Sequence, residues 1–455
     1  MVWKQNQPGV WQDDLDGAEK VFYDMSQAFR PVGKEHGSVY SVLRICTRYL
    51  NETTPFEKRL RGAWISLRFK FPMLSVTVDG ARKMFVKANS QEVEHWANET
   101  FYIDRTGVPA AQVVSMLHLR QLPCLLFLSQ SSELVFHSSH WRIDALGACI
   151  VMNRLLELLS EDVSTAPVWD FEFQNLSPSL EDAFGSPTDS TVSMKAVADT
   201  VRQRNFETSY PTAGLSPSDS AMSILPTIST AHALELTREA TSALIAACRS
   251  HQISITAAVH AACAQAVFEH SRENSYDYST IVSVNLRDQL PSPYNTKAHG
   301  CATYVTGMTH TVKREDPFLS HAVQLSRAYR GDWDVNEYMR ALRPIYKVHG
   351  ETLGALARSG ARNPNTTVTI SSLGIIDGYI ENDHGPVLVE EFRLGSAIMT
   401  RQMTLYIWTF LDKMTLSLDS NEAYYSSDMV KDLLDSIRLC LERELVVDLP
   451  IEKRT

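Results

Sequence analysis

The residues with the clearest capacity for chemistry are His140 and Asp144, which stand four positions apart in the segment 137–145, HSSHWRIDA. Residues 133–141 alternate in polarity as a β-strand does, and Asp144 begins a helical pattern. A histidine at the end of a strand projects between the layers of a fold, where a substrate can reach it. Its ordinary pKa of about 6.5 suits proton abstraction at neutral pH. A histidine in this position has the capacity to deprotonate an alcohol or an amine as it attacks a carbonyl group.

The same segment allows two other interpretations. In one, Asp144 only caps the following helix with its side chain, and His140 is a packed strand residue. In the other, His137 and His140 bind a metal ion together. A zinc site in a protein needs a third ligand, and we find none at a suitable spacing, so we expect no metal. The choice between base and helix cap stays open on these residues alone.

Several well-known catalytic motifs are missing from the sequence. There is no G-x-S-x-G turn for a nucleophilic serine, no G-x-x-x-x-G-K-[ST] loop for nucleotide phosphates, no G-x-G-x-x-G turn for a dinucleotide and no H-E-x-x-H zinc motif. Nucleophile-elbow hydrolases, P-loop enzymes, dinucleotide-binding enzymes and zincins therefore lose support.

The elements that must position this segment in the first half of the chain mix strands and helices. Residues 124–128 are a continuous apolar run suited to a buried strand, and residues 133–141 predict a second strand. Residues 64–76 also alternate as a strand does, with a break at Pro72. A helix with one apolar side is predicted to start at Asp144.

The second half follows a crossover rich in Ser, Pro, Asp and Thr at residues 163–228, which contains a short helix at 194–204. Ser254 or Thr256 can cap an alanine-rich helix that ends near His270. The other expected elements are a helix at 237–249, strands at 279–285, 303–310, 366–371 and 402–418, and a final helix at 428–445. Because strands and helices intermix without a strict βαβ order, we expect an α/β fold with mixed sheets, of the α+β type.

The bulk composition limits the class of partner. The chain of 455 residues has a formal charge of −10 at pH 7 and a sequence pI of about 5.8. Nucleic acids and anionic membranes attract basic surfaces, so we expect neither as a partner. The seven cysteines form no C-x-x-C pair, which is typical of reduced thiols. With no apolar signal core and no run of about 18 apolar residues, we expect a cytoplasmic protein.

Segment 137–145 resembles the H-H-x-x-x-D-G signature of the chloramphenicol-acetyltransferase-like superfamily. This superfamily includes plant BAHD acyltransferases, condensation domains of peptide synthetases and fungal trichothecene O-acetyltransferases. The match is to the core H-x-x-x-D, because Ser139 replaces the first histidine and Ala145 replaces the glycine. Fungal and plant O-acyltransferases commonly keep only this core, and the plant D-F-G-W-G motif is absent. The fungal enzymes are therefore the closer comparison.

A second segment, residues 282–291 (VSVNLRDQLP), resembles the V-N-x-R strand of the same superfamily. The resemblance implies that Arg287 forms a salt bridge with Asp144. Asp144 would then organise the loop so that the histidine points into the active site. The alternative is a surface pair of Arg287 with Asp288, which would carry little energy.

A third segment, residues 367–376 (TVTISSLGII), resembles the S-x-L-G strand in the C-terminal half of such enzymes. The resemblance implies that Ser371 or Ser372 donates a hydrogen bond to a tetrahedral oxyanion. The alternative for either serine is a strand that simply ends at a glycine turn.

The resemblance also implies the architecture. It predicts two chloramphenicol-acetyltransferase-like subdomains that form a pseudo-symmetric V with a central channel. We expect the N-terminal subdomain, which carries H-x-x-x-D, at residues 1–170, a crossover linker at 171–228 and the C-terminal subdomain at 229–455. We expect the protein to be a monomer.

The function that the resemblance implies is acyl-CoA-dependent O-acylation, with acetyl as the default group, of a hydroxyl on a fungal secondary metabolite. His140 is then the general base, acetyl-CoA or another acyl-CoA is a co-substrate, and no cofactor is bound. The partners are this acyl-CoA and a small-molecule alcohol. Two alternatives remain. One is a same-fold enzyme of CoA-independent cyclisation, pericyclic or carrier-protein-dependent condensation chemistry, and the other is a non-catalytic binding protein with a decayed site.

Overall fold

The chain folds into two compact units, and each unit draws on three separate stretches of sequence. The first unit consists of Met1–Ser186, Asn285–Val305 and Asp377–Ala397, and the second consists of Pro187–Val284, Thr306–Ile376 and Ile398–Thr455. The division that we expected at residues 170 and 229 assigned 285–305 and 377–397 to the C-terminal half. The computed structural model describes residues 3–15, 17–48, 55–161, 171–208, 211–217, 224–272, 276–331, 333–359 and 366–452, with only the main chain for 208 and 356–359.

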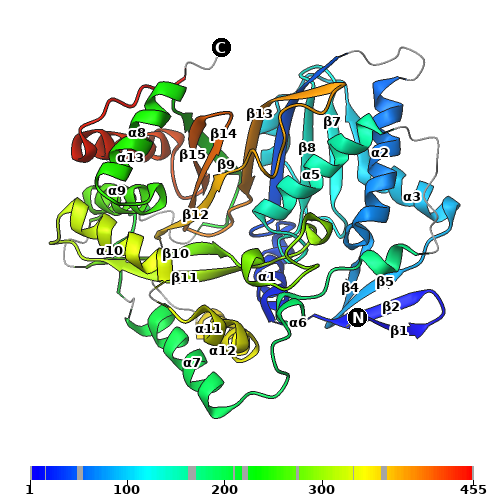
Figure 1. Ribbon diagram of the computed structural model, residues 1–455, viewed down its shortest axis with the longest axis horizontal. Helices are drawn as coiled ribbons and strands as arrows, with labels where there is room; N and C mark the ends of the chain where they lie inside the picture. The colour runs from blue at the N-terminus through cyan, green and yellow to red at the C-terminus, as the bar shows by residue number, and fades with distance from the viewer. Residues whose placement is uncertain are drawn as a thin grey trace. The chain divides into compact units, whose positions relative to one another are not determined.

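A five-stranded mixed sheet forms the centre of the first unit. Across the sheet its strands are β13 (Val387–Ser396), β3 (Val39–Thr47), β8 (Glu133–Ser138), β7 (Cys124–Leu128) and β6 (Phe101–Asp104). Neighbouring strands are antiparallel except for β6 and β7, which are parallel. In Figure 1, helices α2 (Phe56–Lys70) and α5 (Ala145–Ser160) lie side by side over this sheet. The expected strand at 124–128 is confirmed, whereas the next strand ends at Ser138 and not at 141.

The strand that we predicted at residues 64–76 is wrong, because this stretch belongs mainly to helix α2. Leu60, Trp64 and Leu67 are fully buried and recur at helical spacing. The Trp64 indole also donates a hydrogen bond of 3.0 Å to the Thr100 hydroxyl of α3 (Ser90–Thr100). The local alternation around Pro72 is thus a coincidence, and the proline begins a short 3₁₀ helix after α2.

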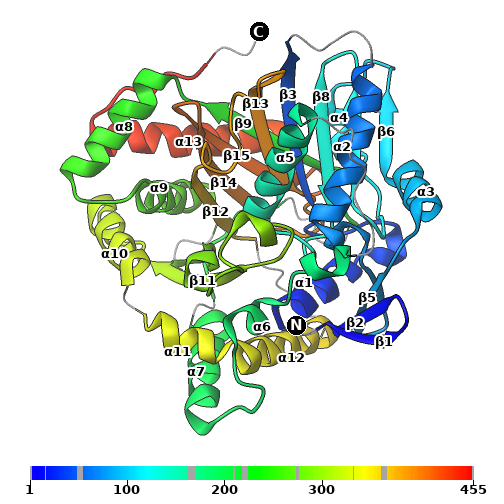
Figure 2. The same cartoon turned by 45° about the vertical axis from the view of Figure 1, so that its right-hand side comes forward.

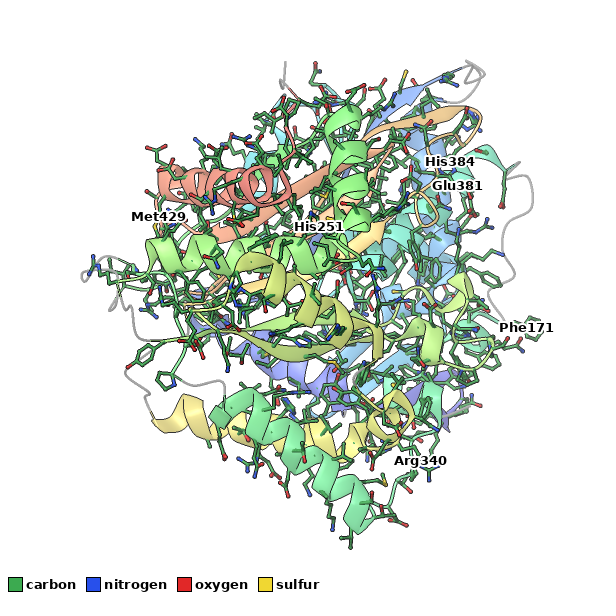
Figure 3. The ribbon with its side chains drawn as sticks, turned by 60° about the vertical axis from the view of Figure 1, so that its left-hand side comes forward. Phe171, His251, Arg340, Glu381, His384 and Met429 are labelled. Atoms are coloured by element: carbon green, nitrogen blue, oxygen red, sulfur yellow. The ribbon has the colours of Figure 1, made fainter. Side chains whose placement is uncertain are left out.

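Residues 377–397 belong to the first unit because β13 pairs with β3 along its whole length. The loop before β13 is also attached to α5. The Glu381 amide donates to Asn153 Oδ1 at 2.8 Å, and the Ser160 hydroxyl donates to the His384 carbonyl. Glu381 and His384 lie close together in this loop (Figure 3). The position of residues 377–397 in the sequence did not predict that they pack on β3 and α5.

A small four-stranded sheet and helix α1 (Gly17–Gln27) complete the part of the first unit that bears on function. The sheet order is β1 (Lys4–Gln7), β2 (Val10–Asp14), β5 (Arg82–Val86) and β4 (Thr77–Asp79). Lys83 of β5 is fully buried and holds α1 through Glu19 at 2.5 Å, and it also contacts Asp13 at 2.9 Å. This buried ion cluster fixes the position of α1, which supplies Phe22 to the candidate site.

The second unit has a six-stranded sheet covered by helices. Its strands, in order, are β11 (Val305–Val312), β10 (Tyr278–Asn285), β12 (Val368–Ile375), β14 (Met403–Phe410), β15 (Lys413–Asn421) and β9 (Ser229–Glu235). Its helices are α7 (Val192–Gln203), α8 (Arg238–Ser250), α9 (Ile255–His270), α10 (Phe318–Gly331), α11 (Val335–Arg340), α12 (Leu342–Ser359) and α13 (Ser427–Leu445). Figure 2 shows α9 between α10 and α13.

The predictions for the second unit succeed where local signals are strong. Ser254 caps the alanine-rich helix α9 by accepting from the Ala257 amide, and the final helix begins at Ser427. The single strand predicted at 402–418 is wrong, because the chain turns there to form the hairpin of β14 and β15. Leu411 and Asp412 make this turn with φ of 50° and 63°. The pair Leu-Asp is not one of the residue pairs, such as Asn-Gly or Asp-Gly, that predict a hairpin turn from sequence.

Candidate active site

His140 stands on a turn that follows β8. The Arg142 amide donates to the Ser139 carbonyl at 3.1 Å, and the Ile143 amide donates to the His140 carbonyl at 3.3 Å. The Thr303 hydroxyl donates to the same His140 carbonyl at 2.6 Å. The expected placement of His140 within a strand is therefore wrong. The direction of the histidine side chain is therefore set by the turn and by Thr303. It is not set by the alternation of side chains along a strand.

The His140 ring is partly exposed and held on one face by Phe22 of α1. The two rings are parallel to within 2°, with centroids 4.1 Å apart. Nδ1 is enclosed and bonds to no other side chain among the described residues, so Nε2 is the nitrogen left for a substrate. Burial lowers the pKa of His140, and a contact with its own main chain and the Asp144 charge partly oppose this. The imidazole is therefore neutral at pH 7, as a general base must be.

Asp144 combines two of the roles that the sequence left open. Its Oδ1 accepts a hydrogen bond of 2.8 Å from the Gly147 amide and so caps α5. Its Oδ2 accepts from Arg287 Nη1 and from the Tyr304 amide, each at 2.8 Å. Both carboxylate oxygens are thus occupied by structural partners. The arrangement makes Asp144 the fixed point of the turn.

The ion pair of Asp144 with Arg287 is buried, with 3% and 4% of the two residues exposed. Arg287 Nη2 also donates to the Ala302 carbonyl at 3.2 Å. Removing one partner of such a pair leaves an uncompensated buried charge, at a cost of about 3–5 kcal/mol. Space around it is tight: a Cβ on Gly147 would lie 2.4 Å from the Gly300 carbonyl oxygen. The site therefore tolerates no side chain at position 147, the third residue of α5.

Sequence reasoning missed a group of polar residues beside this turn. Glu35 and His36 precede β3, and Arg142 lies on the turn itself. Burial raises the pKa of Glu35 to about 7, while burial and the nearby His140 charge lower the pKa of His36 to about 4. No sequence signal pointed to Glu35 and His36, because they lie about a hundred residues before the motif.

The two candidate oxyanion donors belong to the second unit, on β12. The Ser372 hydroxyl shares a hydrogen bond of 2.8 Å with the Thr256 hydroxyl at the start of α9. Successive side chains of a strand point to opposite faces, so Ser371 projects away from α9. The structure thus separates a pair that the sequence treated as equivalent. The role of either serine at an oxyanion stays a prediction.

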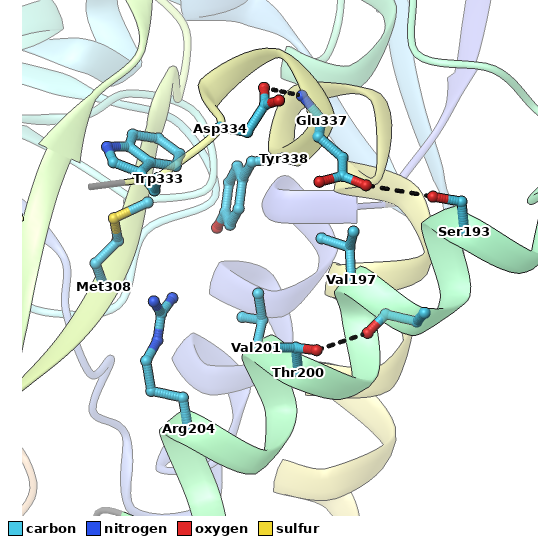
Figure 4. Close-up of a pocket in the computed structure, with 11 residues that line it drawn as sticks. Ser193, Val197, Thr200, Val201, Arg204, Met308, Trp333, Asp334, Glu337 and Tyr338 are labelled. Carbon is cyan, nitrogen blue, oxygen red and sulfur yellow. Dashed lines mark hydrogen bonds between the residues drawn. The ribbon is translucent and has the colours of Figure 1, made fainter. Parts of the chain in front are cut away.

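A pocket of about 300 Å³ lies in the second unit, between α7, β11 and the start of α11. Met308, Trp333 and Tyr338 face Val197 of α7, and Arg204 closes one end (Figure 4). Its polar rim is already engaged within the protein: Asp334 caps α11, and Glu337 accepts from Ser193. The volume is at the lower end of the range for small-molecule sites.

Within the described ranges, no group of three or more His, Cys, Asp and Glu side chains is arranged to hold a metal ion. His137, the proposed metal partner of His140, is buried inside β8. Among the helices described, none has the length and apolar character needed to span a membrane. All seven cysteines are free thiols.

Comparisons with known proteins identify the class. Residues 226–418 match the family model described as the C-terminus of phthiocerol/phthiodiolone dimycocerosyl transferase. The fold matches the crystal structure of the trichothecene 15-O-acetyltransferase TRI3 from Fusarium sporotrichioides with a TM-score of 0.82, over 96% of this chain and 97% of that one, at 16% identity. The protein is an acyltransferase with the chloramphenicol-acetyltransferase-like fold that condensation domains share.

Two curated relatives define the family more closely. The chain is 40% identical to the O-acetyltransferase pigM of Monascus ruber, over 99% of its own length and 88% of the relative. It is 32% identical to the azaphilone biosynthesis cluster protein M of Aspergillus terreus, over 98% of both chains. The chain belongs to this family of fungal O-acetyltransferases.

Proposed function

We propose that this protein transfers an acetyl group from acetyl-CoA to a hydroxyl of a fungal secondary metabolite, with His140 as the general base. The observation that carries the proposal is the His140 turn. A neutral imidazole is held partly exposed there, against Phe22 and on a buried network of Asp144 and Arg287. A residue with only a packing role would not need that support.

The mechanism is direct transfer through a complex that contains both substrates. His140 Nε2 takes the proton of the acceptor hydroxyl as its oxygen attacks the thioester carbonyl. The resulting tetrahedral oxyanion requires a hydrogen-bond donor, for which Ser371 or Ser372 is the candidate. When the intermediate collapses, the carbon–sulfur bond breaks and protonated His140 returns its proton to the departing thiolate. No covalent enzyme intermediate is needed.

Asp144 contributes position and charge to this cycle and does not take part in proton transfer. Its negative charge favours the imidazolium that forms when His140 accepts the proton. Its fixed hydrogen bonds hold the turn, so the imidazole does not have to reorganise during the reaction. Arg287 therefore acts on the reaction only through Asp144.

The names of the relatives narrow the substrate class. One relative is named as an O-acetyltransferase and another as a protein of an azaphilone biosynthesis cluster. For the present chain we propose a hydroxylated polyketide of the azaphilone type as acceptor. Acetyl-CoA is a co-substrate and not a resident cofactor, and we propose that the enzyme works as a monomer in the cytoplasm.

The test is an assay of the purified protein with acetyl-CoA and a panel of hydroxylated polyketides. The expected result is release of the CoA thiol, read with a thiol reagent, together with a product that has gained the mass of one acetyl group. Calorimetry of CoA binding separates the alternatives. A protein that converts an acceptor without binding CoA would belong to the CoA-independent class, and one that binds ligands without turnover would be a binding protein.

A further inference from the structure

We propose that Glu35 positions the His140 turn through Ser139 and Arg142. The inference rests on the proposed function, because it concerns the same base, and it adds a residue that the H-x-x-x-D motif does not contain. Glu35 does not touch the reacting atoms, and its effect reaches them through the turn.

The sheet register places Glu35 beside the turn. Strands β3 and β8 run antiparallel with Val39 opposite Ser138, so the residues before Val39 and those after Ser138 leave the sheet at the same edge. The segment before β3 is fixed there, because the Gly37 amide donates to the Ala397 carbonyl at 2.7 Å. Glu35 and Ser139 thus come together from distant parts of the sequence.

The Glu35 carboxyl is buried but incompletely satisfied. The residue is 5% exposed, and both carboxyl oxygens are enclosed without a well-formed hydrogen bond to any described residue. Leaving such a group without partners costs about 1–3 kcal/mol, more when it is charged, so its presence calls for a reason. A position in which it supports a catalytic turn supplies one.

Arg142 links Glu35 to the rest of the scaffold. Its guanidinium is 1% exposed and donates to the main-chain carbonyls of Met73, Val76 and Gln121, the last two at 2.7 and 3.0 Å. It thereby ties the turn to two other loops. Among the described residues, no carboxylate lies at ion-pair distance from Arg142. The charge of Glu35 still acts on Arg142 and raises its pKa, against the effect of burial.

The protonation state follows from the balance of burial and neighbours. Burial raises the pKa of Glu35 to about 7, and the Ser139 hydroxyl and the Arg142 charge only partly oppose it. Above pH 7 the buried carboxyl ionises, and the cost of desolvating this charge disturbs the turn. Ser139 occupies the position of the first histidine in the H-H-x-x-x-D-G signature that segment 137–145 resembles.

The other titratable groups around the turn do not change over the same pH range. His36 is neutral at pH 7, because burial and the His140 charge lower its pKa to about 4. Burial raises the pKa of the Cys301 thiol to about 12. Glu19 of α1 is paired with Lys83. A change in activity just above pH 7 therefore reports on Glu35.

The experiment compares pH profiles of kcat/KM for the wild-type enzyme and Glu35→Gln, which mimics the neutral acid. We expect wild-type activity to fall above about pH 7, and Glu35→Gln to keep wild-type activity at pH 6 and lose this falling limb. At pH 8 a group with a pKa of about 7 is about 90% ionised, so Glu35→Gln should be up to about tenfold faster than wild type there. Glu94→Gln, on an exposed surface pair, is the matched control and should follow wild type.

Two outcomes overturn the inference. One is a Glu35→Gln profile that coincides with wild type, and the other is a loss of activity of equal size at every pH, which indicates a packing role alone. His140→Ala separates this inference from the proposed function. If that variant stays active, the assigned base is wrong. If it is inactive while the falling limb persists in Glu35→Gln, only the role of Glu35 fails.

Discussion

Burial lowers the pKa of both His140 in the first unit and His260 in the second, yet the surroundings of the two histidines differ in kind. His260 lies inside helix α9 and is 0% exposed. Its Nδ1 shares a hydrogen bond of 2.6 Å with the Tyr329 hydroxyl of α10. Burial, with the charges of His310 and His321, lowers its pKa to about 3. His140 instead stands on a turn and is partly exposed.

The difference separates the effect of burial from the features that we propose for a base. A lowered pKa is common to both histidines and follows from burial alone, so it does not identify a catalytic group. Partial exposure, combined with Phe22 stacked on the ring and a buried Asp144–Arg287 pair that supports the turn, distinguishes His140. The predictions below test whether this distinction holds in activity and in stability.

The largest expected effect is on catalysis by His140→Ala. Loss of the general base should lower kcat by about 10²–10⁴-fold, since that is the usual contribution of a positioned base. Binding of acetyl-CoA by calorimetry should be unchanged, because the imidazole acts on the acceptor. Near-normal turnover in this variant would remove the basis of the comparison.

A second prediction concerns the two serines of β12. If one donates to the oxyanion, its replacement by alanine should lower kcat by about 10²–10³-fold with little change in KM. Ser371 and Ser372 point to opposite faces, so we expect only one of Ser371→Ala and Ser372→Ala to have this effect. Thr256→Ala is the matched control for loss of the Ser372 hydrogen bond. Full activity in both serine variants would place the oxyanion donor elsewhere.

A third prediction concerns the support of the turn. Asp144→Asn should lower kcat by about 10²-fold, because the imidazole loses both its fixed position and a favourable charge. It should also lower the free energy of unfolding in urea by up to about 3–5 kcal/mol, since Arg287 then lacks its counter-charge. Arg287→Met in the Asp144→Asn background should cost less than the two single changes added together. Additive costs would argue that the pair is not a coupled unit.

The sequence predicted residues that the structure brings together at this turn, but it did not predict their setting. The H-x-x-x-D and V-N-L-R segments carry residue types that meet in one network, so a short motif was enough to find His140, Asp144 and Arg287. The turn is also contacted by residues from distant segments, namely Phe22, Glu35 and Thr303. Strand register and loop packing bring them there, and no local sequence pattern predicts such contacts. Trp64 illustrates the opposite failure, because a short alternation of polarity suggested a strand where burial at helical spacing decides for α2.

The smallest expected effect on activity comes from His260→Phe, which should keep kcat within about twofold because the residue lies outside the reaction. Its effect is on stability and depends on pH. The unfolded histidine binds a proton below its ordinary pKa of about 6.5, whereas the folded one stays neutral down to about 3. The wild-type protein therefore loses stability as the pH falls from 6.5 towards 3, by up to about 1.4 kcal/mol per pH unit from this residue. Urea unfolding at pH 7 and pH 5 should show a smaller loss for His260→Phe than for wild type. An equal loss of stability in both proteins would contradict the burial of a neutral His260. A large fall in kcat would mean that His260, like His140, matters for the reaction.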